Sequence, residues 1–278
     1  MGARYHDPNG LECGVPPSRG TNPSERLLED DEPPAFEVYG ADARSPYVIA
    51  CDHASRRIPR ALGSLGVPEA ELGRHIAWDI GVAELGEKLA DRLDAWLIRQ
   101  NYSRLVIDCN RRPGRPDSSP TQSEDTPIPG NLELSREAAA LRAREIFEPY
   151  HARIAAELDA RAARGAPAVL IFLHTFTPVF RGVERQWHAG VLYHRDARLA
   201  EPLLSALRRE AGFEIGDNQP YAATALTDYG IVEHAERRGL VHVELEVRQD
   251  LVSDSEGQVA WAERLARLIA SSARELGF

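Results

Sequence analysis

Lysine and cysteine are scarce in this sequence of 278 residues, and each scarcity limits which binding sites or disulfides the sequence can indicate. All but one of the 33 basic residues are arginine, the exception being Lys88, so an arginine beside a motif is weak support for a binding role. The three cysteines cannot all pair, and Cys51 and Cys109 lie inside apolar runs, where cysteine usually packs as a small hydrophobic residue. The sequence therefore predicts a reducing compartment rather than a disulfide framework.

Long hydrophobic runs and an excess of positive charge are also missing. No stretch approaches the roughly 18 consecutive apolar residues of a membrane-spanning helix, and the N-terminus lacks the succession typical of a signal peptide. The formal net charge is −10, whereas a general nucleic-acid binder needs a basic face to displace counterions. We therefore expect a soluble cytoplasmic protein with neither nucleic-acid nor membrane partners, and the sequence predicts no oligomeric state.

What is present is the composition of a globular protein, with 43% hydrophobic and 27% charged residues. Residues 1–35 are rich in Pro, Gly, Ser and acidic residues and show no apolar period, so we expect a mobile N-terminal tail there. Residues 36–278 are then expected to form a single α/β domain that carries the functional site.

Apolar runs alternate with amphipathic segments along this domain. The pattern predicts strands over 47–51, 95–100, 104–110, 168–176, 190–194 and 242–249. It predicts helices over 79–94, 135–164, 197–211, a segment that ends near 238, and 257–276. Strands separated by helices indicate an α/β layer architecture around a mainly parallel sheet, in which ligands bind at the carboxyl ends of the strands.

Three of the predicted strands carry groups that can bind a metal or move a proton. His53 follows the first strand, His174 lies in the fourth, and Glu244 and Glu246 lie in the last. Catalytic zinc commonly takes three protein ligands from His, Asp and Glu, and Asp79 is the candidate for the third. The local zinc motif HExxH is absent, and an isolated histidine at a strand end is more often a hydrogen-bonded structural residue. The metal hypothesis therefore depends on these residues meeting in space.

The same segments predict a proton acceptor and an anion site. Glu244 and Glu246 share one face of a strand, where a carboxylate is suited to act as general base; the alternative is that both are solvated on an edge strand. Asn110 and Arg111 follow an apolar run and are suited to holding a substrate carboxylate. The proline-rich segment 111–130 that begins with Arg111 is a candidate lid.

At these residues the chain resembles the N-formylglutamate amidohydrolase family. The matching segments occur in the family's order: CDHASRRIP (51–59), HIAWDIG (75–81), SRLVIDCNRRP (103–113), LHTFTP (173–178), WHAGVLYHRD (187–196), GDNQPY (216–221) and LEVRQDL (245–251). The resemblance implies a three-layer α/β sandwich with a mixed, mainly parallel central sheet, similar to zinc carboxypeptidases. It also implies a hydrolase of linear amide bonds, whose type reaction converts N-formyl-L-glutamate into formate and L-glutamate.

The resemblance further implies roles for single residues. One divalent metal ion, expected to be zinc, is held by His53 and His174, with Asp79 completing the set. Glu246 rather than Glu244 is the general base. The residues that the resemblance implies in substrate binding are Asn110 and Arg111 at the carboxylate, with Arg185, Asn218, Tyr221 and His234 along the pocket.

One departure from the family and two alternatives stay open. Asp52 precedes His53, whereas the family members that act in histidine degradation carry proline at this position. The resemblance therefore does not fix the acyl group or the amino acid of the substrate. A catalytically silent protein that binds a small molecule on the same fold is one alternative. The other is a cysteine hydrolase that uses Cys51 or Cys109 with His53 or His174, although both cysteines fall within predicted strands rather than at an exposed turn.

Overall fold

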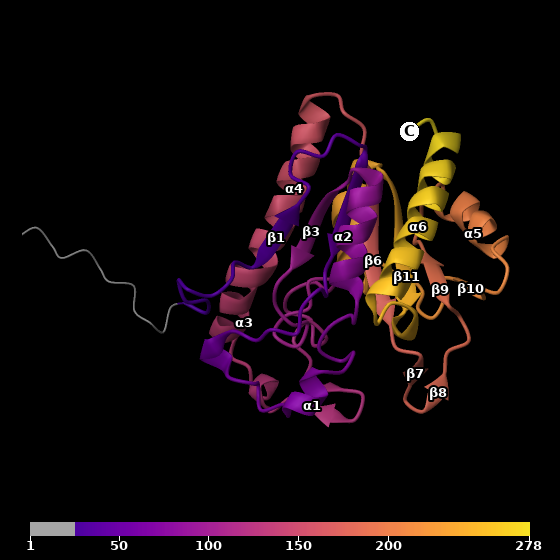
Figure 1. Cartoon of the computed structure of the whole chain (residues 1–278). Helices are drawn as coiled ribbons and strands as arrows, with labels where there is room; N and C mark the ends of the chain where they lie inside the picture. Colours follow the sequence, from indigo (N-terminus) through magenta and orange to yellow (C-terminus); the bar gives the residue numbers. More distant parts are fainter. Residues whose placement is uncertain (1–25) are drawn as a thin grey trace, which may run out of the picture.

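The computed structural model describes residues 26–278, in which seven strands form the central sheet (Figure 1). In chain order these strands are β1 (Phe36–Tyr39), β2 (Tyr47–Cys51), β3 (Trp96–Gln100), β6 (Val169–Phe176), β9 (Ala189–Leu192), β10 (Ile215–Asp217) and β11 (Val241–Arg248). Two short hairpins lie outside the sheet and consist of β4 (Gln122–Ser123) with β5 (Thr126–Pro127) and β7 (Val179–Phe180) with β8 (Val183–Glu184).

The sheet is mixed but mainly parallel, as expected. Its strand order is β1-β3-β2-β6-β11-β9-β10. The four central strands β3, β2, β6 and β11 are parallel to one another. β1 pairs antiparallel with β3, and β9 pairs antiparallel with β11. The carboxyl ends of β2, β6 and β11 therefore meet at one edge of the sheet.

Helices cover both faces of the sheet, which gives the three layers of the predicted sandwich. Neighbouring residues of a strand enter different cores: Ile49 packs with the helices of one face and Val48 with those of the other. β2 and β6 are consequently buried along their whole length. One face carries α2 (Val82–Leu93), α5 (Ala200–Arg208) and α6 (Ser255–Glu275), and the other carries α3 (Arg136–Arg142) and α4 (Glu148–Ala163). A short helix, α1 (Glu69–Leu72), lies among the loops beyond the carboxyl ends of the strands (Figure 1).

The helix predicted over 135–164 begins where its capping residue indicates. The Ser135 hydroxyl accepts a hydrogen bond from the Ala138 amide (3.1 Å), which satisfies one of the free donors at the helix start. A π-helical turn, Ala143–Phe147, separates α3 from α4. The segment predicted to end near 238 is a π-helical turn followed by a short 3-10 helix.

The predicted strand over 104–110 is wrong, because this segment forms turns. The run is buried, as its composition requires, but side chains rather than a neighbouring strand satisfy its carbonyl groups. Arg142 Nη1 donates to the Val106 carbonyl (2.9 Å), and Asn131 Nδ2 donates to the Leu105 carbonyl (2.8 Å). A buried apolar run alone cannot distinguish a strand from a loop whose backbone is satisfied in this way.

Most of the predicted tail, residues 1–25, lies outside the described residues, and its mobility stays a prediction. The rest of that segment contacts the domain. Leu27 and Ala35 are buried, and the amides of Leu27 and Leu28 both donate to Glu145 Oε2 (2.8 and 2.9 Å). The packed part of the chain therefore begins within the segment expected to be a tail.

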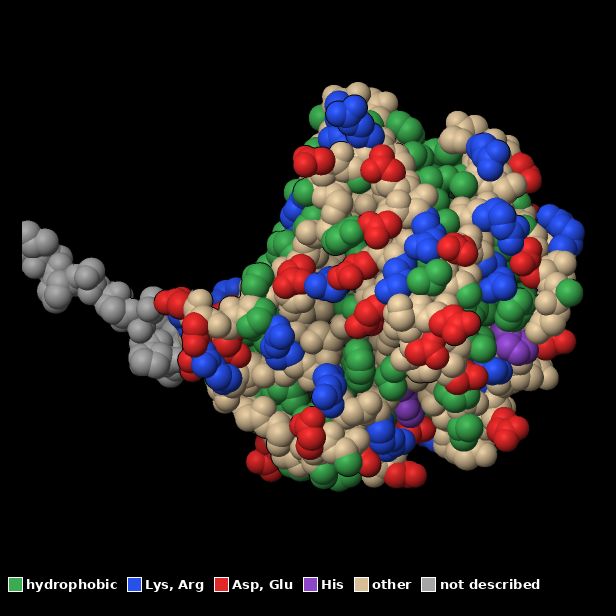
Figure 2. Space-filling view, in the orientation of Figure 1, with side chains coloured by type: hydrophobic (Ala, Val, Ile, Leu, Met, Phe, Trp, Pro, Cys, Tyr) green, Lys and Arg blue, Asp and Glu red, His purple; other side chains and the backbone are tan. Residues whose placement is uncertain are grey.

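Figure 2 shows acidic and basic side chains interspersed over one face of the molecule. Among the helices of residues 26–278, none combines the length and the apolar composition needed to cross a membrane.

Candidate functional site

The strand order brings the polar groups of three strands to one edge of the sheet. β2, β6 and β11 are adjacent and parallel, and His174 on β6 is opposite Glu246 on β11. His53 follows β2 at the same edge. Loops close over this edge and leave a cavity of about 280 Å³ that all three residues line. The convergence on which the metal hypothesis depends therefore occurs.

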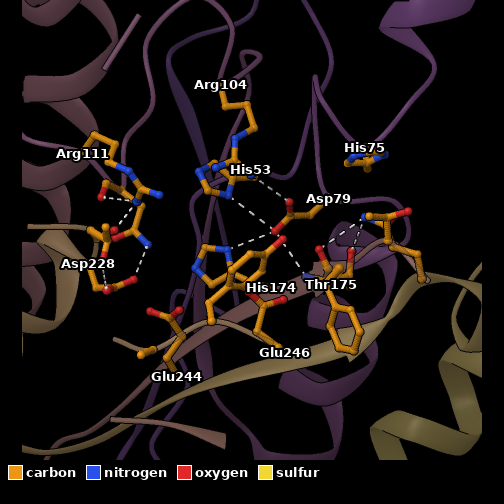
Figure 3. Close-up of a pocket in the computed structure, with 17 residues that line it drawn as sticks. His53, His75, Asp79, Arg104, Arg111, His174, Thr175, Asp228, Glu244 and Glu246 are labelled. Carbon is orange, nitrogen blue, oxygen red and sulfur yellow. Dashed lines mark hydrogen bonds and ion pairs between the residues drawn. The ribbon is translucent and has the colours of Figure 1, made fainter. Parts of the chain in front are cut away.

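His53, Asp79 and His174 meet at this cavity (Figure 3). Asp79 Oδ2 lies 3.0 Å from His174 Nδ1 and 3.5 Å from His53 Nδ1. All three side chains are buried. Asp79 belongs to the turn before α2, where its amide donates to the His53 carbonyl (2.9 Å) and its Oδ2 accepts from the Thr175 amide (3.2 Å). Backbone contacts to both neighbouring segments thus fix the carboxylate between the two imidazoles.

A second carboxylate holds the far side of the His53 ring. Asp108 Oδ1 lies 2.7 Å from His53 Nε2, so this nitrogen is engaged and Nδ1 faces Asp79. Arg104 donates to Asp108 Oδ2 (2.9 Å) and lies 3.4 Å from Asp79 Oδ1. A carboxylate on the outer nitrogen fixes the tautomer and orientation of a ligand histidine. Asp108 is in this position relative to His53, and Arg104 links the two carboxylates.

His174 has a corresponding carboxylate in Asp52. Asp52 Oδ2 lies 4.0 Å from His174 Nε2. The hydroxyl of Tyr150, on α4, donates to Asp52 Oδ1 (2.6 Å) and anchors it from the layer of helices behind the sheet. Two layers of the fold therefore position these groups. The sheet carries His174 on β6, and α4 anchors Asp52 through Tyr150.

The cluster has both the donor set and the unsatisfied atoms that a metal ion requires. Two imidazoles and one carboxylate are a common set in catalytic zinc sites, which keep a fourth position open. The candidate ligand atoms all lie within 4.8 Å of one another. In the described part of the chain, His53 Nδ1 and His174 Nε2 are buried without a hydrogen-bond partner, which is costly unless another group satisfies them. The residues present fit a divalent cation.

Attraction between carboxylates and imidazoles shifts the proton affinity of the cluster. Burial opposes the ionisation of Asp79, but His53 and His174 outweigh it and hold the pKa of Asp79 far below its usual range. Burial likewise opposes ionisation of Asp108, yet His53 and Arg104 lower its pKa. Burial also opposes protonation of His174, while its hydrogen bond with Asp79 raises its pKa well above the usual value. The cluster therefore stabilises positive charge at its centre.

Glu244 and Glu246 are not solvated on an edge strand, because β11 lies between β6 and β9. The two residues are 3% and 6% exposed, and both line the cavity. Burial raises the pKa of Glu246 to about 7, a value suited to accepting and returning a proton near neutral pH. Burial and the charge of Asp228 raise the pKa of Glu244 well above its usual range.

Asn110 and Arg111 line the same cavity from the loop that replaces a predicted strand. Arg111 Nη1 donates to the carbonyls of Asn110 (3.0 Å) and Thr227, which holds the guanidinium against this loop. Its Nη2 makes no hydrogen bond within residues 26–278. Asn110 Nδ2 lies 3.4 Å from Asp228 Oδ1. The substrate-binding role of the pair stays a prediction, as does the lid role of segment 111–130.

The structure brings one of the other four candidates into the cavity. Tyr221 lines it, and Arg185 lies beside Tyr221, donating to its hydroxyl (2.8 Å) with the guanidinium 4.6 Å from the ring centroid. Asn218 and His234 are not among the lining residues. Asn218 Oδ1 accepts from a backbone amide (3.1 Å), and His234 Nε2 pairs with His151 Nδ1 (2.8 Å). Their hydrogen-bond partners are not among the lining residues either, so a role in substrate binding stays a prediction for both.

Neither buried cysteine has the environment of a nucleophile. Cys51 and Cys109 are both 0% exposed, and burial raises the pKa of each thiol well above its usual value. A reactive cysteine needs the opposite, namely a lowered pKa and access to substrate. No observation at these two residues favours the cysteine-hydrolase alternative.

Several residues of the site were not singled out from the sequence, among them Arg104, Asp228 and Tyr150. Arg104 lies four residues before Asp108, but the abundance of arginine hides its significance. Asp228 lies in a loop without a distinctive pattern, and Tyr150 reaches Asp52 from another layer. The spacing of Arg104 to Asp108 is the one local signal that could have been used.

Comparison with known proteins agrees with this geometry. The sequence profile of the N-formylglutamate amidohydrolase family matches residues 45–253. The solved structure of a gene product from Agrobacterium tumefaciens is 33% identical, with 91% of this chain and 100% of that chain covered and a TM-score of 0.88. An N-formylglutamate amidohydrolase from Ralstonia eutropha JMP134 is 17% identical, with 87% and 97% covered and a TM-score of 0.61, which shows a shared fold. No curated protein matches the sequence significantly.

Proposed function

This chain belongs to the N-formylglutamate amidohydrolase family and is a hydrolase of amide bonds, and from that premise we propose a metal-dependent enzyme that deacylates an N-acyl amino acid. The expected acyl group is formyl, as in N-formyl-L-glutamate, and the expected ion is zinc. One observation carries the proposal: His53, Asp79 and His174 converge beside Glu246 in a single buried cavity.

The residues divide into an ion-binding set and a substrate-binding set. His53, Asp79 and His174 hold the ion, which when bound acts as a Lewis acid on the acyl carbonyl. Asn110 and Arg111 hold the carboxylate of the amino acid, because the amide and the guanidinium offer several N–H donors to one planar acceptor.

Glu246 moves the proton. Its Oε2 is buried and free of protein partners, so it can accept the proton of the attacking water. The hydroxyl of that water joins the acyl carbon, the C–N bond breaks, and Glu246 returns the proton to the departing nitrogen. Arg104, fixed by Asp79 and Asp108, supplies a positive charge near the carbonyl oxygen as negative charge develops on it. With a formyl substrate the products are formate and the free amino acid.

Metal analysis followed by a formate-release assay on a panel of N-formyl amino acids tests the proposal. We expect a divalent ion in the purified protein, loss of formate release after chelation, and recovery when the ion is restored. Undiminished hydrolysis by the chelated protein would overturn the metal-dependent mechanism. A protein that holds the ion but hydrolyses no N-acyl amino acid would instead be the silent binding protein.

A further inference from the structure

The β7–β8 hairpin extends from the wall of the cavity into solvent. It follows Thr177, which lines the cavity, and it projects beyond the carboxyl ends of the central strands (Figure 1). Arg181 and Gly182 form its two-residue turn with φ angles of +49° and +77°, the pair of positive values that tight hairpin turns favour. Residues 181–184 are all exposed. An exposed segment of this kind is held by few packing contacts, so it can open without disturbing the core.

One hydrogen bond joins this hairpin to a distant part of the described chain. The Arg181 amide donates to Glu124 Oε1 (3.1 Å), and Glu124 lies at the turn between β4 and β5. The other hydrogen bonds of residues 179–184 stay within 177–185. The Glu124 side chain is 8% exposed, although the neighbouring Asp125 is exposed. A carboxylate at a surface turn is thus enclosed between two hairpins.

The β4–β5 side of this contact is firmly anchored. Arg74 donates to Glu124 Oε2 and also to Glu71 Oε2 on α1. The Thr126 hydroxyl, on β5, donates to the same oxygen of Glu71 (2.5 Å). His75 Nε2 lies 3.4 Å from Glu124 Oε2. Glu124 is therefore a fixed acceptor, with one oxygen facing the anchored segment and the other holding the tip of the exposed hairpin.

The two hairpins meet over the approach to the ion cluster. His75 lines the cavity, and it also lines two outer depressions of about 240 and 380 Å³. Ser123 and Phe180 line the smaller depression, whereas Glu124 and Arg181 line the larger one. Figure 3 shows His75 on one side of the ion cluster. The contact between Glu124 and the Arg181 amide therefore spans the mouth of the cavity, with a depression on either side of it.

We propose that the β7–β8 hairpin (residues 178–185) is a flap over the cavity and that Glu124 is the positioning residue that latches the flap closed over bound substrate. This inference rests on the proposed function, because the reaction takes place at the ion cluster beneath the flap. Opening breaks one hydrogen bond, that between the Arg181 amide and Glu124, and leaves the anchored segment in place. Closure holds the substrate and excludes water, so the latch acts on substrate binding more than on proton transfer by Glu246. None of the three ion ligands belongs to the flap.

Glu124→Ala tests the latch through steady-state kinetics with N-formyl-L-glutamate. The variant lacks the acceptor for the Arg181 amide, so we expect KM to rise about tenfold or more, while kcat stays within about threefold of the wild-type value and metal content is unchanged. Glu124→Gln keeps an oxygen at the same place and should recover most of the wild-type KM.

Glu145→Ala is the matched control for these two variants. Glu145 Oε2 likewise accepts from backbone amides, those of Leu27 and Leu28, but it does so away from the cavity, so KM and kcat should both stay at the wild-type level. An unchanged KM in Glu124→Ala would overturn the inference. A KM for Glu124→Gln as high as that for Glu124→Ala would contradict a latch made by the acceptor oxygen.

Hydrogen exchange measured by mass spectrometry tests the opening itself and requires no turnover. Without substrate, Glu124→Ala should speed exchange in peptides covering 178–185 by about tenfold or more, and Glu145→Ala should not. In the metal-loaded Glu246→Gln variant, N-formyl-L-glutamate whose binding is confirmed by calorimetry should slow exchange in 178–185. Exchange that responds neither to Glu124→Ala nor to bound substrate would refute the flap. If the wild type hydrolyses no N-formyl amino acid, the proposed function fails, while the effect of Glu124→Ala on exchange still decides whether the latch exists.

Discussion

The structure contains two pairs of buried histidines whose rings are almost equally far apart but whose surroundings differ. The ring centroids of His53 and His174 are 5.0 Å apart, and those of His151 and His234 are 5.1 Å apart. The first pair is enclosed by carboxylates. The second pair is hydrogen-bonded internally (2.8 Å) and to the Cys109 carbonyl (2.8 Å), and aromatic rings pack around it.

The surroundings decide the charge that each pair can carry. The hydrogen bond with Asp79 raises the pKa of His174 despite its burial, whereas burial lowers the pKa of both His151 and His234 to about 3. The first pair stabilises a cation, and the second stays neutral and serves as packing and backbone support. Burial and ring spacing alone therefore do not distinguish a candidate metal site from a structural pair of histidines; the carboxylates around the rings do.

Removing one histidine from each pair should produce the largest contrast. His174→Ala deletes a proposed ligand, so we expect metal affinity to fall by more than the roughly 10–100-fold typical of losing an outer hydrogen-bond partner, with hydrolysis abolished. His234→Ala should leave metal affinity unchanged while lowering the thermal unfolding midpoint, because a buried side chain is truncated. Competition against a chromophoric chelator measures both affinities. Equal losses of affinity in the two variants would contradict the assignment.

Glu246→Gln separates the proton acceptor from the ion-binding set. Because the amide cannot accept and return the proton, we expect kcat to fall by about 10²- to 10⁴-fold. Metal content should stay at the wild-type level, since Glu246 is not one of the three clustered ligands. The assay is formate release by metal-loaded protein, with metal content measured on the same sample. A variant that loses its metal would show that Glu246 belongs to the ion site instead.

Asp108→Asn tests whether the carboxylates prepare the first pair for a cation. The substitution keeps the shape but weakens the hydrogen bond to His53, so metal affinity should fall by about 10–100-fold. Asp196→Asn is a matched control away from the cavity, because Asp196 also lies beside a histidine (His242, 3.9 Å) and pairs with an arginine (Arg198, 2.6 Å). Chelator competition should show no change for the control, and a similar drop in both would point to a general loss of stability.

The sequence predicts the first pair far better than the second. Apolar runs identify β2, β6 and β11, and the parallel arrangement that such runs favour brings His53, His174 and Glu246 to one edge. Nothing local relates His151 to His234, which lie in different helical segments 83 positions apart. The contact of Tyr150 with Asp52 is hidden for the same reason, because the two residues are far apart in the sequence. The wrong strand over 104–110 has a related cause: side chains distant in the sequence satisfy the backbone of this buried segment, and no local pattern predicts them. β1 is short and partly exposed, and β10 has only three residues. Neither strand shows enough alternation of apolar and polar residues to be predicted from the sequence.

The smallest expected effect is on stability in acid, and it belongs to the second pair. The folded-state pKa of about 3 for His151 and His234 lies below the value of about 6.5 expected in the unfolded chain. Above pH 6.5 both states leave the pair neutral, so its protonation does not make stability depend on pH there. Between these two values the unfolded state binds protons that the folded state refuses, so each histidine lowers the free energy of unfolding by up to about 1.4 kcal/mol per pH unit as the pH falls.

His234→Phe removes one of these proton-binding groups, and its stability should decline less steeply between pH 6.5 and pH 4.5 than that of the wild type. Urea unfolding of the metal-free proteins across this range measures the two slopes. The ion cluster is the same in both proteins and cancels in the difference, so the comparison isolates the second pair even though the variant is less stable at neutral pH. Parallel slopes would mean that His234 is already protonated in the folded protein, and the two pairs would then not differ in the way that their surroundings imply.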